Sequence, residues 1–404
     1  MLINLSFVII IAVILNLIFT KCKLPGLLGM ILTGVLLGPS VFDLISPQVL
    51  EMSGELKIAA LIVILIRAGL GINKQTLNRI GIPALKMSCI PGLMEGCTVT
   101  VISHFLLGLP YVEAGMLGFI IAAVSPAVVV PQMLELKAEG FGKKKEIPTL
   151  VLAGASVDDV FAITIFGVFL NMGMGAGDGY ASLLYKVPAG ILGGILIGGA
   201  IGFFLVWLFK RFRMRDTKKV ILFMIIAILF HDLSELTPVK NVLPIASLLG
   251  VMVIGFVLLE KNDELANRLA MKFNKIWVLA EILLFALIGS QVKIEVLNLS
   301  MVGTGLLILA LGLTARSIGV WISLLKSELE YKERLFCVIA YLPKATVQAA
   351  IGAVPLAMVL DGKMTSMTVQ SGELILAMAV LSIVVTAPIG AIGIKLTGKR
   401  FLGN

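Results

Sequence analysis

Apolar runs long enough to cross a lipid bilayer recur along almost the whole of this 404-residue chain. About 20 apolar residues in a helix span the hydrocarbon core, and a backbone inside lipid must satisfy its hydrogen bonds internally. Hydrophobic residues make up 59% of the sequence and charged residues only 14%, against about 25% in a soluble protein. The runs therefore predict an all-α polytopic membrane protein and exclude a soluble globular domain.

We expect about thirteen transmembrane helices. They cover residues 2–20, 24–42, 54–72, 83–108, 112–135, 147–171, 183–209, 218–234, 242–260, 275–290, 300–325, 333–359 and 370–395. The first run has neither a cationic start nor a small-residue cleavage site, so it is predicted to be a retained helix and not a cleaved signal.

The basic residues test this topology, because cytoplasmic connections carry an excess of Lys and Arg. Most of the 33 Lys and Arg residues lie in or beside the odd-numbered connections and the C-terminal tail. The other side carries Lys57, Lys186, Lys240, Lys293 and Lys363, and three more lie inside spans, namely Arg67, Arg316 and Lys344. We therefore expect an integral protein of the cell membrane, plasma or inner, with its N-terminus outside and its C-terminus in the cytoplasm.

The net charge of +9 is explained by this topology and needs no nucleic-acid partner. Basic segments next to a membrane attract anionic lipid. The run KRFRMRDTKK at 210–219 is the best candidate for such a contact, although it is also what a plain cytoplasmic loop looks like.

Two adjacent aspartates, Asp158 and Asp159, lie near the middle of the apolar run 147–171. Insertion scales put an isolated charge at the bilayer centre at roughly 2.5–3.5 kcal/mol, so ionisable residues at that depth are functional candidates. The charges far from any span end are Glu95, Asp158, Asp159, Arg316 and Lys344. Two acids can pair with the two bases, and the remaining carboxylate is a candidate site for a cation or a proton.

Prolines interrupt two spans at corresponding positions. The fifth span contains AAVSPAVVVP, with Pro126 and Pro131, and the twelfth contains AYLPKATVQAAIGAVP, with Pro343 and Pro355. Backbone groups freed by proline are tolerated in a membrane only where they line a cavity or are buried in protein. The two spans are seven apart and so run in opposite directions, which indicates an inverted-topology repeat around a transport site.

Five segments carry a family resemblance: LPGLLGMILTGVLLGPS (24–40), LIRAGLGI (65–72), AAVSPAVVVPQML (122–134), IPTLVLAGASVDDV (147–160) and LPKATVQAAIG (342–352). Together they resemble the cation/proton antiporter superfamily, and most closely the NHA-type sodium/proton antiporters. The resemblance implies an NhaA-like fold with two discontinuous crossing helices, in a homodimer whose cores move like an elevator. The domains it implies are dimerisation helices at 1–82, a first core repeat at 83–171, dimerisation or linker helices at 183–290 and a second core repeat at 300–397.

The resemblance also implies the residues of the ion site. Asp158 and Asp159 match the paired aspartates that bind cation and proton, and Ser125 matches a position that helps to ligate the ion. Na+ and Li+ are hard cations that prefer oxygen ligands, which these side chains, carbonyls of the broken helices and water could supply. Burial raises the pKa of a carboxylate and a nearby cation lowers it, so one site can hold either a proton or a cation.

Three further residues are implied as charge partners in the core. Glu95 and Arg316 match an ion pair, and Lys344 matches a lysine near the aspartates. Many relatives carry lysine where Arg316 stands, but arginine is effectively always protonated, so Arg316 is predicted to be structural. We expect Asp159 to be the principal carboxylate and Asp158 to be held by Lys344 when the site is empty. A proton carried by Lys344 itself stays open.

The predicted function is therefore exchange of Na+ or Li+ for H+, with no enzymatic step and no cofactor. A sodium-coupled symporter of an organic anion is the alternative with a related fold. An intramembrane aspartyl protease needs two carboxylates that face each other and share a proton. Adjacent residues on one helix point about 100° apart, which disfavours that enzyme.

Overall fold

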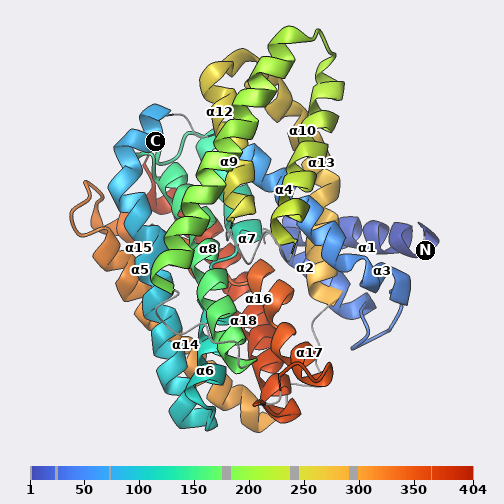
Figure 1. Cartoon of the computed structure of the whole chain (residues 1–404), viewed down its shortest axis with the longest axis vertical. Helices are drawn as coiled ribbons and strands as arrows, with labels where there is room; N and C mark the ends of the chain where they lie inside the picture. Colours follow the sequence, from blue (N-terminus) through green and yellow to red (C-terminus); the bar gives the residue numbers. More distant parts are fainter. Residues whose placement is uncertain are drawn as a thin grey trace. The chain divides into compact units, whose positions relative to one another are not determined.

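The computed structural model describes residues 2–22, 26–71, 74–174, 183–236, 245–290, 299–364 and 366–403, and all regular elements in these ranges are helices (Figure 1). They group into two compact units. Unit 1 contains residues 1–52, 82–183 and 285–404, and unit 2 contains residues 53–81 and 184–284. Of the charges behind the predicted topology, Lys23, Lys240 and Lys293 lie outside the described residues.

Unit 1 contains all six predicted site residues, four of them on helices and two, Ser125 and Lys344, in breaks between helices. In chain order its elements are α1 (Leu2–Lys21), α2 (Gly26–Leu37), α3 (Pro47–Glu51), most of α5 (Lys74–Leu107), α6 (Tyr111–Ala122), α7 (Pro126–Ala138), the 3-10 helix η1 (Lys143–Lys145), α8 (Ile147–Gly173), the end of α13 (Asp263–Ser290), α14 (Leu299–Ser323), α15 (Tyr331–Ala340), α16 (Thr346–Ile351), α17 (Val354–Leu360) and α18 (Val369–Phe401).

Unit 2 is built from α4 (Ser53–Gly69), most of α9 (Leu183–Arg211), α10 (Asp216–Glu235), α12 (Ser247–Lys261) and the larger part of α13. Glycines let two of its helix pairs approach closely. A Cβ built on Gly69 would lie 2.1 Å from the carbonyl oxygen of Met252, and one built on Gly198 would lie 2.4 Å from that of Gly250. Small residues at such crossings are typical of helices that pack inside a membrane.

Described helices lie in each of the thirteen predicted spans: two of them (α6 and α7) in the fifth, three (α15, α16 and α17) in the twelfth, and one in each of the others. In the described ranges, eight helices are both long and apolar enough to cross a membrane, and Gly26–Leu37 and Thr346–Leu360 are shorter apolar stretches. The chain is thus an all-helical integral membrane protein, whereas the number thirteen stays a prediction. Residues 1–52 fall in unit 1, so the predicted dimerisation segment 1–82 is divided between the units, and which helices dimerise also stays a prediction.

The tenth span begins earlier than its apolar run suggests. The sequence predicts 275–290, but α13 begins at Asp263. Asn262 Oδ1 accepts a hydrogen bond of 3.2 Å from the backbone nitrogen of Leu265, and Asp263 and Glu264 occupy the first turn. A capping side chain and acids at a helix N-terminus both stabilise the start of a helix. Apolarity predicts where a helix is buried, not where it begins.

Both predicted helix breaks are present. Residues 123–125 separate α6 from α7, and residues 341–345 separate α15 from α16. Pro126 begins α7, and Pro355 lies at the start of α17. Proline alone does not explain the breaks, because Pro131 lies inside α7 without interrupting it.

Candidate functional site

The two helix breaks meet inside unit 1. The backbone nitrogen of Ser125 donates a hydrogen bond of 2.8 Å to the carbonyl oxygen of Pro343. The Oγ of Ser125 lies 3.4 Å from the Oγ1 of Thr346, and Ala123 packs in one buried cluster with Val347. A backbone nitrogen of the first break and a backbone carbonyl of the second are therefore hydrogen-bonded to each other. Partners of this kind allow non-helical backbone at membrane depth.

Next to the breaks, four buried charged side chains form a network centred on Arg316, all with fully buried side chains. Arg316 Nη1 lies 2.7 Å from Glu95 Oε2, and Arg316 Nη2 lies 2.7 Å from Asp158 Oδ2. Lys344 Nζ lies 2.6 Å from Glu95 Oε2. The network joins α5, α8, α14 and the second break, four segments far apart in the sequence.

Backbone carbonyls complete the surroundings of Arg316. Its Nε donates to the carbonyl oxygen of Tyr341 at 2.7 Å, and its Nη1 also donates to that of Ala122. The guanidinium lies 5.4 Å from the centre of the Tyr341 ring. A guanidinium presents five donors in a rigid fork, so Arg316 links both carboxylates to both breaks.

The predicted contact between Glu95 and Arg316 is present, but the expected contact between Lys344 and Asp158 is wrong for this conformation. Asp158 Oδ2 instead accepts from Arg316 and, at 2.8 Å, from the backbone nitrogen of Val124. Lys344 donates to Glu95, and its own backbone nitrogen donates to Thr386 Oγ1 at 2.9 Å. One forked cation can bind two carboxylates, and this leaves the single ammonium of Lys344 for Glu95.

Asp159 differs from its neighbour Asp158. Asp159 is 6% exposed, and its Oδ1, like that of Asp158, has no hydrogen-bond partner among the described residues. No ion pair of Asp159 is found in that part of the chain, whereas Glu95 and Asp158 both have one. Because successive helical residues point about 100° apart, one aspartate faces Arg316 and the other does not. Asp159 is the carboxylate left over after the two acids and two bases have paired.

Four residues at this site were not found by the search for ionisable side chains: Tyr341, Thr346, Gln348 and Thr386. Gln348 Nε2 donates to the carbonyl oxygens of Ile120, Ile121 and Ala123 at 2.9, 3.3 and 3.0 Å. The signal that could have found two of them is in the segment LPKATVQAAIG, where Thr346 and Gln348 interrupt an apolar span without adding charge.

The site has too few acidic side chains to bind a metal ion with these alone. In the ranges that the structure describes, no group of three or more His, Cys, Asp or Glu side chains could hold one. A cation at Asp158 and Asp159 would need further oxygens, and hydroxyls and carbonyls are the neighbouring groups that can provide them.

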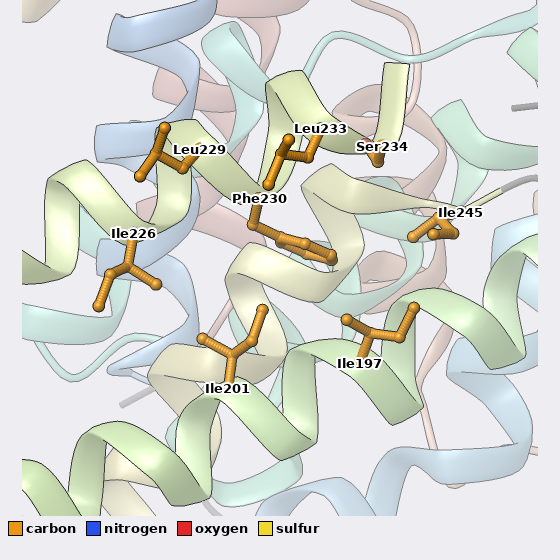
Figure 2. Close-up of a pocket in the computed structure, with 8 residues that line it drawn as sticks. All are labelled: Ile197, Ile201, Ile226, Leu229, Phe230, Leu233, Ser234 and Ile245. Atoms are coloured by element: carbon orange, nitrogen blue, oxygen red, sulfur yellow. The ribbon is translucent and has the colours of Figure 1, made fainter. Parts of the chain in front are cut away.

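A cavity in unit 2 is of a different kind. Its volume is about 380 Å³, and Figure 2 shows the Phe230 ring extending from α10 toward Ile197 and Ile201 of α9. Ser234 is the polar residue of its lining, and its Oγ already donates to the carbonyl oxygen of His231. An apolar cavity of this kind does not offer ligands to an ion.

Comparison with known proteins supports a transporter. The family described as "Sodium/hydrogen exchanger, transmembrane" matches residues 7–400. Sodium/hydrogen exchanger 9B2 of Mus musculus is 36% identical over 392 residues, which cover 95% of this chain and 69% of that protein. Sodium/hydrogen exchanger 9B1 of Homo sapiens is 32% identical over 381 residues, which cover 94% and 73%.

A solved structure shares the fold. The sodium proton antiporter MjNhaP1 from Methanocaldococcus jannaschii superposes with a TM-score of 0.77 and covers 100% of this chain and 99% of its own, at 18% sequence identity. The arrangement of helices described above is therefore that of an antiporter fold.

Proposed function

Because the chain belongs to the sodium/hydrogen exchanger family, we propose that it exchanges Na+ or Li+ for H+, and that the two compete for Asp159 and Asp158. The family argues against the alternative of a sodium-coupled organic-anion symporter and against an enzyme. The cation is cargo in this proposal, and no resident cofactor takes part.

The unpaired state of Asp159 is the observation that carries the proposal. A buried carboxylate without a counter-charge is costly when ionised, so it favours either a proton or a bound cation. Asp158 is already paired with Arg316 at 2.7 Å, so Asp159 is the aspartate that takes up and releases the proton, and Asp158 contributes to the same site as a ligand of the cation. Ser125 and Thr346, whose hydroxyl oxygens lie 3.4 Å apart where the breaks meet, are further candidate ligands for the cation.

In the proposed cycle Asp159 releases a proton when the cation binds and takes one up when the cation leaves. Arg316 holds Asp158 and Glu95 throughout, because a guanidinium does not lose its proton. Lys344 contacts Glu95 and not an aspartate, so a proton on Lys344 would be a second, separate one. Measuring the membrane potential during exchange distinguishes these cases, since one proton per Na+ generates no potential and two protons generate one.

We further propose thirteen spans with the N-terminus outside and the C-terminus in the cytoplasm, an inverted repeat, and elevator-type movement in a homodimer of the cell membrane. The alternation of basic residues supports the orientation. The two breaks, seven spans apart, support the repeat. The basic run 210–219 is the proposed contact for anionic lipid.

Transport in proteoliposomes tests the proposal. With the wild type, adding Na+ or Li+ should dissipate a preset proton gradient. Asp159→Asn should reduce this to the level of protein-free vesicles, because the neutral amide cannot exchange a proton for a cation. Asp361→Asn is the matched control: that exposed aspartate lies 3.1 Å from Lys363 and should be dispensable. Sodium-driven proton movement by Asp159→Asn at the wild-type rate would refute the role of Asp159.

A further inference from the structure

The C-terminal end of α6 is capped by side chains from two other helices. The last four carbonyls of an α-helix have no partner within the helix. Here Gln348 Nε2 donates to the carbonyl oxygens of Ile120, Ile121 and Ala123, and Arg316 Nη1 donates to that of Ala122. Four successive carbonyls at the first break are thus occupied by donors from α16 and α14.

The end of α6 that carries these carbonyls lies beside Asp158, whose Oδ2 accepts a hydrogen bond from the backbone nitrogen of Val124. A Cβ built on Gly92 would lie 2.8 Å from Asp158 Oδ1 and 3.9 Å from the carbonyl oxygen of Ala122. Ala123 packs in one cluster with Ala162, which follows Asp158 by one helical turn on α8. The carbonyl end of α6 is therefore close to the position at which a cation would bind.

An uncapped helix C-terminus would attract that cation. It carries roughly half a negative charge, and carbonyl oxygens of broken helices are suitable ligands for Na+. The two N–H groups of Gln348 Nε2 are shared among three of these oxygens, and because the amide is neutral it adds no positive charge that would repel the ion. Its Nε2 faces the carbonyls because an amide oxygen in that position would meet three other acceptors.

We propose that Gln348 is a positioning residue that withholds the carbonyls at the end of α6 from the transported cation and so leaves the cation dependent on the aspartates. This inference rests on the proposed function. It assigns to Gln348 control over how tightly the cation binds, because carbonyls that cannot release a proton would hold a cation without exchanging it.

Gln348→Met tests the proposal, since methionine has a similar length and no amide. Gln132→Met on α7 is the control, because Gln132 Nε2 donates to a single carbonyl, that of Val128, at 3.1 Å within its own helix. The melting temperature in detergent is measured over a series of Na+ concentrations at fixed pH. The apparent KM for Na+ is measured in proteoliposomes.

Without Na+, Gln348→Met should melt below the wild type, because three buried carbonyls lose their donor. Na+ should then raise its melting temperature more than that of the wild type, since a ligand stabilises the state that binds it more tightly. The apparent KM for Na+ should fall roughly fivefold or more, which is the order expected when buried acceptors regain a partner. Gln132→Met should behave like the wild type in both measurements.

Two results would overturn the proposal. A lower melting temperature with a wild-type response to Na+ and an unchanged KM would mean that Gln348 is only a helix cap. A raised KM would mean that Gln348 Oε1, which is buried and has no partner among the described residues, is itself a ligand of the cation.

If Gln348→Met does not fold, Gln348→Asn serves in its place, because it keeps the amide but is one methylene too short to reach all three carbonyls. A smaller fall in KM is then expected, and an unchanged or raised KM overturns the proposal. If the wild type itself shows neither sodium-dependent melting nor exchange, the proposed function fails together with this inference.

Discussion

Unit 1 contains two ionic clusters of similar geometry and very different surroundings. In the buried cluster, Arg316 and Lys344 contact Glu95 and Asp158 over 2.6–2.7 Å with fully buried side chains. In the surface cluster, Lys145 of η1 contacts Glu330 at 3.1 Å and Glu333 at 2.8 Å before and within the first turn of α15. The side chains of Lys145, Glu330 and Glu333 are 24%, 78% and 12% exposed.

The comparison shows that the distance between the two charged atoms of an ion pair does not determine how much the pair contributes to stability. In water an exposed pair contributes little and is screened by salt, with a usual range of about 0–1 kcal/mol. In the interior, removing one partner leaves a charge that nothing else neutralises, at a cost of about 3–5 kcal/mol. The buried cluster therefore constrains which helices must stay together, whereas the surface cluster only adjusts their stability.

Of the substitutions proposed to test this comparison, Arg316→Met should lower the stability most. It leaves Asp158 without a counter-charge and removes donors from two backbone carbonyls, while Lys344 can still pair with Glu95. We expect a loss of about 3–5 kcal/mol, seen as a strongly lowered melting temperature or as failure to fold.

Arg334→Met is the control for Arg316→Met, because within the described residues Arg334 on α15 donates to the carbonyls of Leu329 and Ser327 and lies over the Trp321 ring, with no carboxylate bound. Thermal unfolding in detergent compares the two variants. Equal losses in both would contradict the distinction between buried and accessible charges.

Gly154→Ala should have an intermediate effect, through packing and not through charge. A Cβ at Gly154 would lie 2.0 Å from the hydroxyl oxygen of Tyr341, whose ring supports Arg316. Overpacking of this kind costs about 1–3 kcal/mol. Adding Tyr341→Phe removes the clashing oxygen and should restore most of the melting temperature.

Gly167→Ala on the same helix is the control for Gly154→Ala, because a Cβ there meets nothing within 4 Å. It should be neutral or slightly stabilising, since alanine favours a helix more than glycine does. If adding Tyr341→Phe did not restore the melting temperature of Gly154→Ala, the loss would not come from a clash between α8 and Tyr341 of the second break.

Lys145→Met should have the smallest effect, a loss of a few tenths to about 1 kcal/mol at neutral pH that shrinks as salt is added. The hydrogen bond to Glu333, together with that to Glu330, raises the pKa of Lys145 above its ordinary value of 10.5. The contribution is thus fully present below pH 10.5 and is lost as the pH rises through the higher pKa of the folded state.

Melting curves of the wild type and Lys145→Met between pH 7 and 11 check this, with exposed Lys332→Met as the control. The difference between the two proteins should shrink toward the alkaline end. A difference that grows with pH would show that Lys145 does not act through its charge.

Much of the site follows from apolarity and charge alone. The family resemblance implied the partnership of Glu95 and Arg316. The two breaks and one carboxylate in excess of the bases were predicted from residue types and their depth in apolar runs. These features are local or are required by charge balance, because a charge inside lipid is costly wherever the chain folds. The predicted start of α13 was too late, because the helix begins in a polar segment whose first turn is capped by the side chain of Asn262.

The pairing of individual groups could not be predicted in this way. Arg316 binds both Glu95 and Asp158 because the fold brings three helices and two breaks within reach of one guanidinium. A glutamine side chain has the same donors at any position in a sequence. Only the position of Gln348 against three carbonyls of α6 makes it a cap.

The sequence alone established that this chain is a helical membrane protein with two broken spans and a pair of deep aspartates, since burial in lipid penalises charge and unpaired backbone in any fold. The folded chain decided which base neutralises Asp158, namely Arg316 and not the expected Lys344. Asp158 and Asp159 are chemically identical neighbours, and the direction of each side chain on α8, relative to Arg316, distinguishes them.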